Sequence, residues 1–161
     1  PALSVAFFTK SSTATVPMAV QNAIERAKMN PEVARFTIPL CTSINMNACA
    51  AFILTTTLFI SMSYGVTFSS VELILWVFVA TIAAVGNAGV PMGCFFLASA
   101  LLATMNVPLQ LMGIILPFYA IIDAFETAIN VWSDATCAMI VDKELRQESA
   151  VVVDLDIVLT S

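Results

Sequence analysis

Four polar side chains recur at helical spacing in the last long apolar segment of the chain. Asp123, Thr127, Asn130 and Asp134 are separated by four, three and four residues, with Glu126 beside them. At 3.6 residues per turn, the four form one column on a helix. A carboxylate costs about 2.5–3.5 kcal/mol at the centre of a bilayer on insertion scales. Carboxylates retained in such a helix usually line an ion or substrate pathway, so this polar column indicates part of a transporter.

The composition places the chain in the membrane class. Of its 161 residues, 60% are hydrophobic and 11% are charged, whereas a soluble domain usually has about 25% charged residues. The absence of histidine excludes an imidazole base and a His-ligated metal site. The motifs GxSxG and HExxH are absent too, so we do not expect an enzyme. Six scattered basic residues form no phosphate-binding patch, so we expect no nucleic-acid partner.

The four cysteines are expected to be small buried packing residues. Cys41, Cys49, Cys94 and Cys137 occur singly within apolar segments, and no pair has the CxxC spacing of a zinc site. The chain begins at Pro1 without a methionine or a basic-then-apolar signal segment. We therefore expect a fragment that starts in the middle of a fold.

The distribution of basic residues predicts the topology. Lys and Arg are absent between Arg35 and Lys143. By the positive-inside rule the basic residues on both sides of this gap are cytoplasmic, so the intervening chain must cross the membrane an even number of times. Two apolar stretches, 36–64 and 109–141, are long enough to span, and the C-terminus is predicted to be cytoplasmic.

Two re-entrant hairpins are predicted beside these spans. Residues 71–85 and 90–104 are apolar but only about 15 residues each, short of the roughly 20 needed to cross. They are joined by the sequence GNAG, and their flanks lack basic residues, so this hairpin should enter from the external face. The N-terminal segment up to residue 29 has a polar tip at residues 10–13, and we expect it to belong to a second hairpin that enters from inside.

The first span carries polar residues in its middle. The sequence CTSINMNACA, residues 41–50, contains amides, hydroxyls and poor helix formers. Non-helical backbone at membrane depth is tolerated where it lines a cavity, and an unwound helix offers carbonyl oxygens to sodium. Alternatively, the helix is continuous, and Asn45 and Asn47 form hydrogen bonds with a neighbouring helix.

Together these features resemble the dicarboxylate/amino acid:cation symporter family, which has the glutamate-transporter fold. The resemblance rests on four motifs in the family's order over about 140 residues: KSSTATVP at hairpin 1, NMN in helix 7, AAVGNAGVP at hairpin 2, and the polar column with Glu126, D-x-x-E-T-x-x-N-x-x-x-D, in helix 8. It implies an all-α membrane protein in which this chain forms the C-terminal part of the transport core, with a broken helix and re-entrant hairpins. The full-length protein would also contain six N-terminal helices and form a homotrimer in the plasma membrane, here the bacterial inner membrane.

The resemblance also implies segment boundaries and residue roles. The segments are the second arm of hairpin 1 (1–30), helix 7, unwound near 45–47 (31–66), hairpin 2 (67–105), helix 8 (106–143) and an acidic cytoplasmic tail (144–161). A small amino acid would bind at Ser11, Ser12, Cys49, Asp123, Glu126, Thr127 and Asn130. The co-transported ion, Na⁺, would bind at Cys41, Ser43, Asn45, Asn47, Ala84, Val85, Asn87, Asn130 and Asp134, partly through backbone carbonyls. No organic cofactor is implied.

Two positions depart from the family pattern. Members that carry acidic amino acids have Arg where this chain has Glu126, and a glutamate would repel the substrate's side-chain carboxylate. The bacterial serine/threonine transporters have Glu-Thr at this place, so the resemblance favours a small neutral amino acid, with a cationic one as another option. Asn47 stands where the family usually has Asp, which leaves the number of coupled sodium ions open.

Three other readings remain at this stage. A dicarboxylate or acidic amino acid carrier is the transport-class alternative, and Glu126 argues against it. A non-transporting receptor or assembly partner is the alternative of another class, and the retained ion-site residues Asn130 and Asp134 argue against that. The polar column could also be a structural network between helices.

Overall fold

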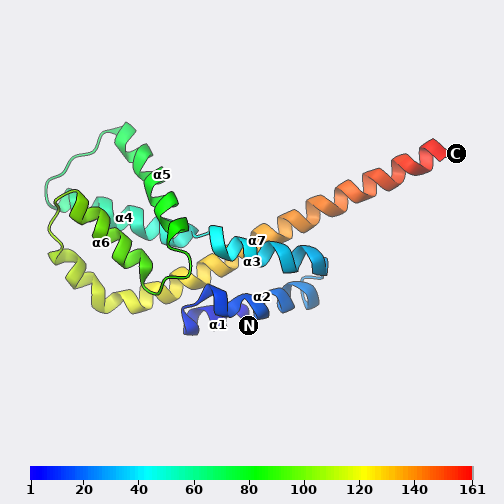
Figure 1. Cartoon of the computed structure of the whole chain (residues 1–161), viewed down its shortest axis with the longest axis horizontal. Coiled ribbons are helices and arrows are strands. Elements are labelled where there is room, and N and C mark those ends of the chain that lie inside the picture. The colour runs from blue at the N-terminus through cyan, green and yellow to red at the C-terminus, as the bar shows by residue number, and fades with distance from the viewer. Residues whose placement is uncertain (161) are drawn as a thin grey trace.

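The computed structural model describes residues 1–160, with side-chain environments through Glu148. The described residues form helices and no strand, which confirms the all-α prediction. The elements are α1 (Ala2–Thr9), α2 (Ser12–Glu25), α3 (Pro31–Ile44), α4 (Asn47–Ser63), α5 (Ser70–Gly86), α6 (Gly93–Thr104) and α7 (Gln110–Thr160). Figure 1 shows α4, α5 and α6 gathered at one end of the molecule, whereas α7 runs along its length.

The first hairpin is formed by α1 and α2. The chain reverses at Lys10, whose backbone is left-handed with φ of 52°. Ser11 then caps α2, because its Oγ accepts a hydrogen bond of 3.2 Å from the backbone N–H of Ala14. Residues 1–30 therefore contain two helices and the tip between them, rather than one arm alone.

The polar segment in the first long apolar stretch is a helix break. α3 ends at Ile44 and α4 begins at Asn47; between them, Asn45 (φ −95°, ψ 73°) and Met46 (φ −100°, ψ 50°) are not helical. A helix that ends frees the carbonyls of its last turn. The break therefore creates acceptors next to α7, against which both α3 and α4 pack.

The second hairpin is formed by α5 and α6. A capping box starts α5: Ser69 Oγ accepts from the backbone N–H of Glu72, and the Glu72 carboxylate accepts from the backbone N–H of Ser69. At the tip, Gly89 has φ of +79°, which favours glycine. The side-chain amide of Asn87 lies where a Cβ on Gly93 would stand, so glycine permits this close approach.

Helix α7 is longer than the segment predicted for it. It continues through residue 160, so most of the predicted tail at 144–161 extends this helix, and Ser161 lies outside the described residues. The part near the C-terminus projects away from the other helices (Figure 1). By length and composition, Pro31–Ser63 and Gln110–Glu148 are candidate membrane spans, whereas α5 and α6 are shorter apolar helices.

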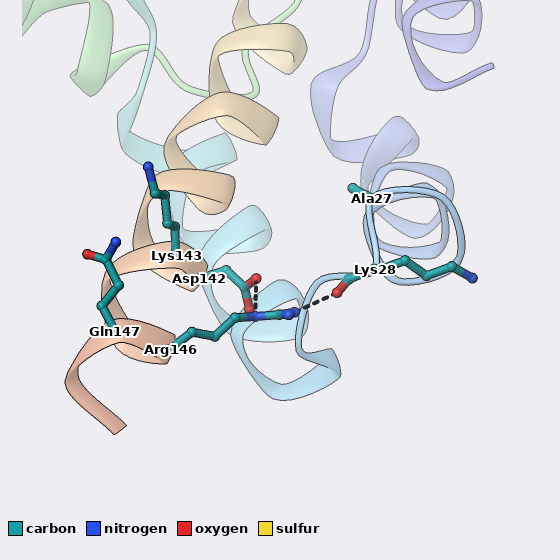
Figure 2. A pocket seen from close by; sticks show the side chains of 6 residues that line it. All are labelled: Ala27, Lys28, Asp142, Lys143, Arg146 and Gln147. Carbon is teal, nitrogen blue, oxygen red and sulfur yellow. Dashed lines mark hydrogen bonds and ion pairs between the residues drawn. The ribbon is translucent and has the colours of Figure 1, made fainter. Parts of the chain in front are cut away.

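A polar clamp joins the α2–α3 turn to α7. Asp142 on α7 accepts a 2.8 Å hydrogen bond from the backbone N–H of Asn30 and pairs with Arg146 Nε at 2.9 Å. Arg146 also donates to the carbonyl of Lys28. Figure 2 shows Arg146 lying between Asp142 and Lys28. Lys28 follows the C-terminal end of α2, whereas the tip of the hairpin precedes its N-terminal end. The clamp therefore fixes the base of this hairpin to α7.

We predict that Asp142→Ala lowers the free energy of unfolding by about 1–3 kcal/mol. The substitution leaves the N–H of Asn30 without its acceptor, and an unsatisfied, partly buried donor costs this much. Arg146→Ala should cost less, because the Arg146 side chain is 57% exposed and exposed ion pairs contribute about 0–1 kcal/mol.

Thermal unfolding of the purified full-length protein measures these differences. Gln147→Ala is the matched control, since Gln147 points away from the clamp (Figure 2). Equal melting temperatures for wild type and Asp142→Ala would show that the clamp does not stabilise the fold.

Candidate functional site

The tips of both hairpins meet α7 at a cavity of about 390 Å³. The first tip contributes residues 9–13, and the second contributes Asn87 and residues 89–94. Met46 and Cys49, at the start of α4, close another side. Three members of the polar column (Asp123, Thr127 and Asn130) line the cavity from α7. The broken helix and both hairpin tips thus converge on the face of α7 that carries the column.

The structure brings most of the predicted substrate residues together. Six of the seven line this cavity: Ser11, Ser12, Cys49, Asp123, Thr127 and Asn130. Glu126, the seventh, is not among the lining residues. It is 5% exposed, and its Oε2 accepts a 3.1 Å hydrogen bond from the hydroxyl of Tyr119.

Two charged residues line the cavity, one of each sign. Asp123 contributes a carboxylate from α7, and Lys10 contributes an ammonium from the first tip. The two groups do not form an ion pair within 4.0 Å among the described residues. A molecule that carries both an ammonium and a carboxylate would find one complementary charge for each.

Asp134 is a buried carboxylate held by neutral donors. It is 1% exposed. Its Oδ2 accepts from Thr42 Oγ1 and its Oδ1 from Asn45 Nδ2, both at 3.0 Å. No ion pair with Asp134 occurs in the described part of the chain. A buried charge without a countercharge is unfavourable, so this arrangement can accommodate a cation at the end of α3, where backbone carbonyls also lie.

Asn130 connects the helix break to the cavity. Its Oδ1 accepts a 2.9 Å hydrogen bond from the backbone N–H of Ala48, and its Nδ2 donates to the sulfurs of Met46 and Cys49 at 3.6 and 3.4 Å. Asn130 is 2% exposed, so these contacts hold the amide in one orientation. The start of α4 is thereby fixed against α7.

The remaining predicted sodium residues are more dispersed. Val85 lines a separate cavity of about 300 Å³ together with Asn45 and Asn47 from the broken helix. The carbonyls of Ala84, Val85 and Asn87 accept hydrogen bonds within the second tip. Ser43 is exposed and donates to the carbonyl of Pro39, and it does not line that cavity. Cys41 is buried, and its carbonyl accepts from the backbone N–H of Asn45 at 2.7 Å.

Several residues of the site were not predicted as functional from the sequence, and four of them bear on its chemistry. Lys10 was read only as part of a polar tip, although it supplies the cavity's positive charge. Thr42 bonds to Asp134, and its hydroxyl just before the break was a usable signal. Tyr119 lies seven residues, or two turns, before Glu126, which also places it on the same helix face. Cys94 lines the cavity, and the sequence carried no signal for it beyond its place after the second tip.

A broken helix, two short hairpins and a polar column facing a cavity are the features of a membrane transport core. The sequence profile of the sodium:dicarboxylate symporter family matches residues 1–144 of the chain. The chain therefore belongs to the sodium:dicarboxylate symporter family, a family of transporters in which sodium accompanies the substrate.

Individual relatives agree with this assignment. The chain is 32% identical over 142 residues to a Caenorhabditis elegans protein named as a sodium-dependent excitatory amino acid transporter, glt-4, covering 88% of this chain. It is 31% identical to the neutral amino acid transporter B(0) of Mus musculus, covering 83% of this chain, and 29% identical to excitatory amino acid transporter 3 of the same species, covering 91%. The chain spans 24–28% of the length of these relatives.

Proposed function

We propose that this chain forms the substrate-carrying part of a longer symporter that couples sodium to the uptake of a small neutral amino acid, such as serine or threonine, by alternating access. Its substrate would lie in the cavity between the two tips and α7, and sodium would bind at Asp134. The complete protein would contain N-terminal helices, form a trimer in a plasma membrane, as in a bacterial inner membrane, and keep its C-terminus in the cytoplasm.

The balanced charge of the cavity supports a zwitterionic substrate. Asp123 is placed to bind the α-ammonium group, while Lys10 and the hydroxyls of Ser11 and Ser12 are placed to bind the α-carboxylate. The ammonium and carboxylate groups of a neutral amino acid would therefore pair with both charged residues of the cavity and leave neither of them without a partner. A dicarboxylate would add a second negative charge, and buried Glu126, just behind the cavity wall, would oppose it.

The uncompensated carboxylate supports sodium coupling. Among the described residues, the donors to Asp134 are neutral groups, Thr42 and Asn45. Na⁺ is a hard cation that prefers oxygen ligands such as this carboxylate. Asn45 reaches Asp134 from the helix break, and Asn130 on the same α7 face reaches the cavity wall. Both Asp134 and Asn130 therefore contact the helix break at residues 45–49, so an ion at Asp134 would influence the substrate cavity through this segment of the backbone.

An acidic substrate is the second candidate, and Lys10 is the observation that favours it. If Lys10 binds a side-chain carboxylate while the hairpin hydroxyls bind the α-carboxylate, aspartate or a related dicarboxylate would fit. One of the relatives above is named for neutral amino acids, and two are named for excitatory ones.

Uptake by the full-length transporter in proteoliposomes tests the proposal. Labelled serine, aspartate and lysine are supplied with an inward sodium gradient or with potassium alone. We expect serine uptake at least about tenfold above the sodium-free level, with little competition from aspartate. Aspartate uptake competed poorly by serine would favour the second candidate, lysine uptake would indicate a cationic substrate, and equal uptake without sodium would reject coupling.

A further inference from the structure

Two cysteines that line the cavity meet a glutamate just behind its wall. Cys49 on α4, Cys94 on α6 and Glu126 on α7 place their sulfurs and a carboxylate oxygen within 4.8 Å of one another. They are 9%, 4% and 5% exposed. Their numbers in the chain are far apart, so sequence spacing gave no sign of this cluster, and it modifies the expectation that all four cysteines only fill space.

One oxygen of the Glu126 carboxylate has no N–H or O–H donor among the described residues, and the Cys94 thiol is the group beside this carboxylate. The hydroxyl of Tyr119 donates to Glu126 Oε2. The Tyr119 ring packs against the rings of Phe52 and Phe95, at centroid-to-centroid distances of 5.1 and 5.3 Å. Glu126 Oε1 is fully buried, and no N–H or O–H donor among the described residues reaches it. A buried acceptor without such a donor is uncommon in a folded protein, and a bound cation is one way to satisfy it.

Two thiolates and a carboxylate are ligands for a thiophilic divalent cation. Zinc binds sulfur at about 2.3 Å and carboxylate oxygen at about 2.0–2.2 Å in a tetrahedral site. Two sulfurs on one tetrahedral zinc lie about 3.8 Å apart, whereas the ligand atoms here lie within 4.8 Å of one another, so the cysteine side chains would move toward each other by up to about 1 Å to bind the ion. Sodium, by contrast, prefers oxygen and is not suited to this cluster.

We propose that Cys49, Cys94 and Glu126 bind a thiophilic divalent cation, Zn²⁺ or Cd²⁺, and that the bound cation holds the second hairpin closed over the substrate cavity. The cation would join α4, α6 and α7 at one point. Cys49 and Cys94 also line the cavity, and Cys49 accepts the hydrogen bond from Asn130. Because a metal-bound thiolate still accepts hydrogen bonds, Asn130 would keep its contact with Cys49, and the cation would tie α6 to the wall of the cavity.

The proposal of a binding site depends only on the geometry of the cluster. The proposed effect of the cation on uptake also depends on the proposed function. A transporter of this design must open a hairpin to admit or release substrate. Occupancy that ties α6 to α4 and α7 would stop that movement, so micromolar cation is expected to inhibit uptake and a chelator to restore it.

Cadmium titration of the purified full-length transporter tests the site directly. The reduced, chelator-stripped protein is titrated with Cd²⁺ while the ultraviolet thiolate-to-cadmium absorption and the bound metal per protomer are measured. Wild type and the matched control Cys137→Ser should each bind one Cd²⁺ with the thiolate absorption. Cys94→Ser should bind at least tenfold more weakly. Glu126→Gln, which preserves the shape of the side chain and the acceptor for Tyr119, should also weaken binding.

Several results would overturn the proposal. Wild-type protein without the thiolate absorption, or Cys94→Ser and Glu126→Gln proteins that bind as wild type does, would remove the site. Serine uptake is then measured with and without cadmium. If cadmium inhibits uptake by the wild type and by Cys137→Ser but not by Cys94→Ser, the bound cation holds the second hairpin closed as proposed. Cadmium that binds without inhibiting uptake overturns that role. Binding with no serine uptake even before cadmium is added contradicts the proposed function and leaves the site supported.

Discussion

Asp134→Asn is expected to weaken sodium binding by at least about 30-fold and to abolish uptake at sodium concentrations that just saturate the wild type. The substitution preserves the size of the side chain and an acceptor for Thr42 or Asn45, but it removes the negative charge. Loss of one partner from a buried, hydrogen-bonded charge pair costs about 2–5 kcal/mol, and each 1.4 kcal/mol is about tenfold in affinity. The sodium dependence of serine binding to the purified full-length transporter measures the change.

Thr136→Ala provides the matched control for this experiment. Thr136 lies on the same helix, but its hydroxyl bonds to the carbonyl of Trp132 and does not contact Asp134. Its sodium dependence should equal that of wild type. If Asp134→Asn protein retained wild-type sodium affinity, Asp134 would be a structural acceptor for the broken helix instead of an ion ligand.

The helical architecture could be predicted because local signals agree with one another. The apolar stretches have lengths that separate spanning from hairpin helices. The glycines at 86 and 89 mark the second tip, and the amides near residue 45 mark the place where α3 gives way to α4. The column from Asp123 to Asp134 requires only the helical period to predict a common face, and the cavity lies on that face.

The environment of Glu126 could not be predicted in the same way. Its spacing, three residues after Asp123 and four before Asn130, places it at the edge of the polar column, and helical geometry alone does not decide whether such an edge residue reaches the cavity. Tyr119 decides the outcome by donating to it from two turns earlier. The approach of Cys94 to Glu126 depends on how α6 packs, which is a tertiary contact between separate elements that no local pattern encodes.

The length of α7 beyond residue 143 was also not evident. The charged residues that follow suggested a separate tail, but charges at helical positions are compatible with a helix once the apolar part has started it. The clamp uses one of these charges, Arg146, together with Asp142 four residues earlier, on the preceding turn.

Asp123→Asn is expected to lower the affinity for serine by at least about 30-fold while leaving sodium binding close to wild type. The Asp123 carboxylate lines the cavity, and its side chain forms no hydrogen bond in the described part of the chain, so it is free to bind a substrate ammonium. Removing that charge eliminates a charge-assisted bond whose loss within a desolvated site costs about 2–5 kcal/mol. Serine binding at saturating sodium, measured by calorimetry on the full-length transporter, checks this.

The contrast between the two aspartates separates their roles. Asp134→Asn should be rescued in part by raising the sodium concentration, because it weakens the ion site, whereas Asp123→Asn should respond only to more serine. Lys10→Gln tests the opposite charge of the cavity: if the substrate is a zwitterion, it should weaken serine binding too, since the carboxylate then loses its cation. Wild-type serine affinity in Asp123→Asn would mean that the ammonium binds elsewhere. The cavity's balance of charge would then no longer support a neutral amino acid over an acidic one.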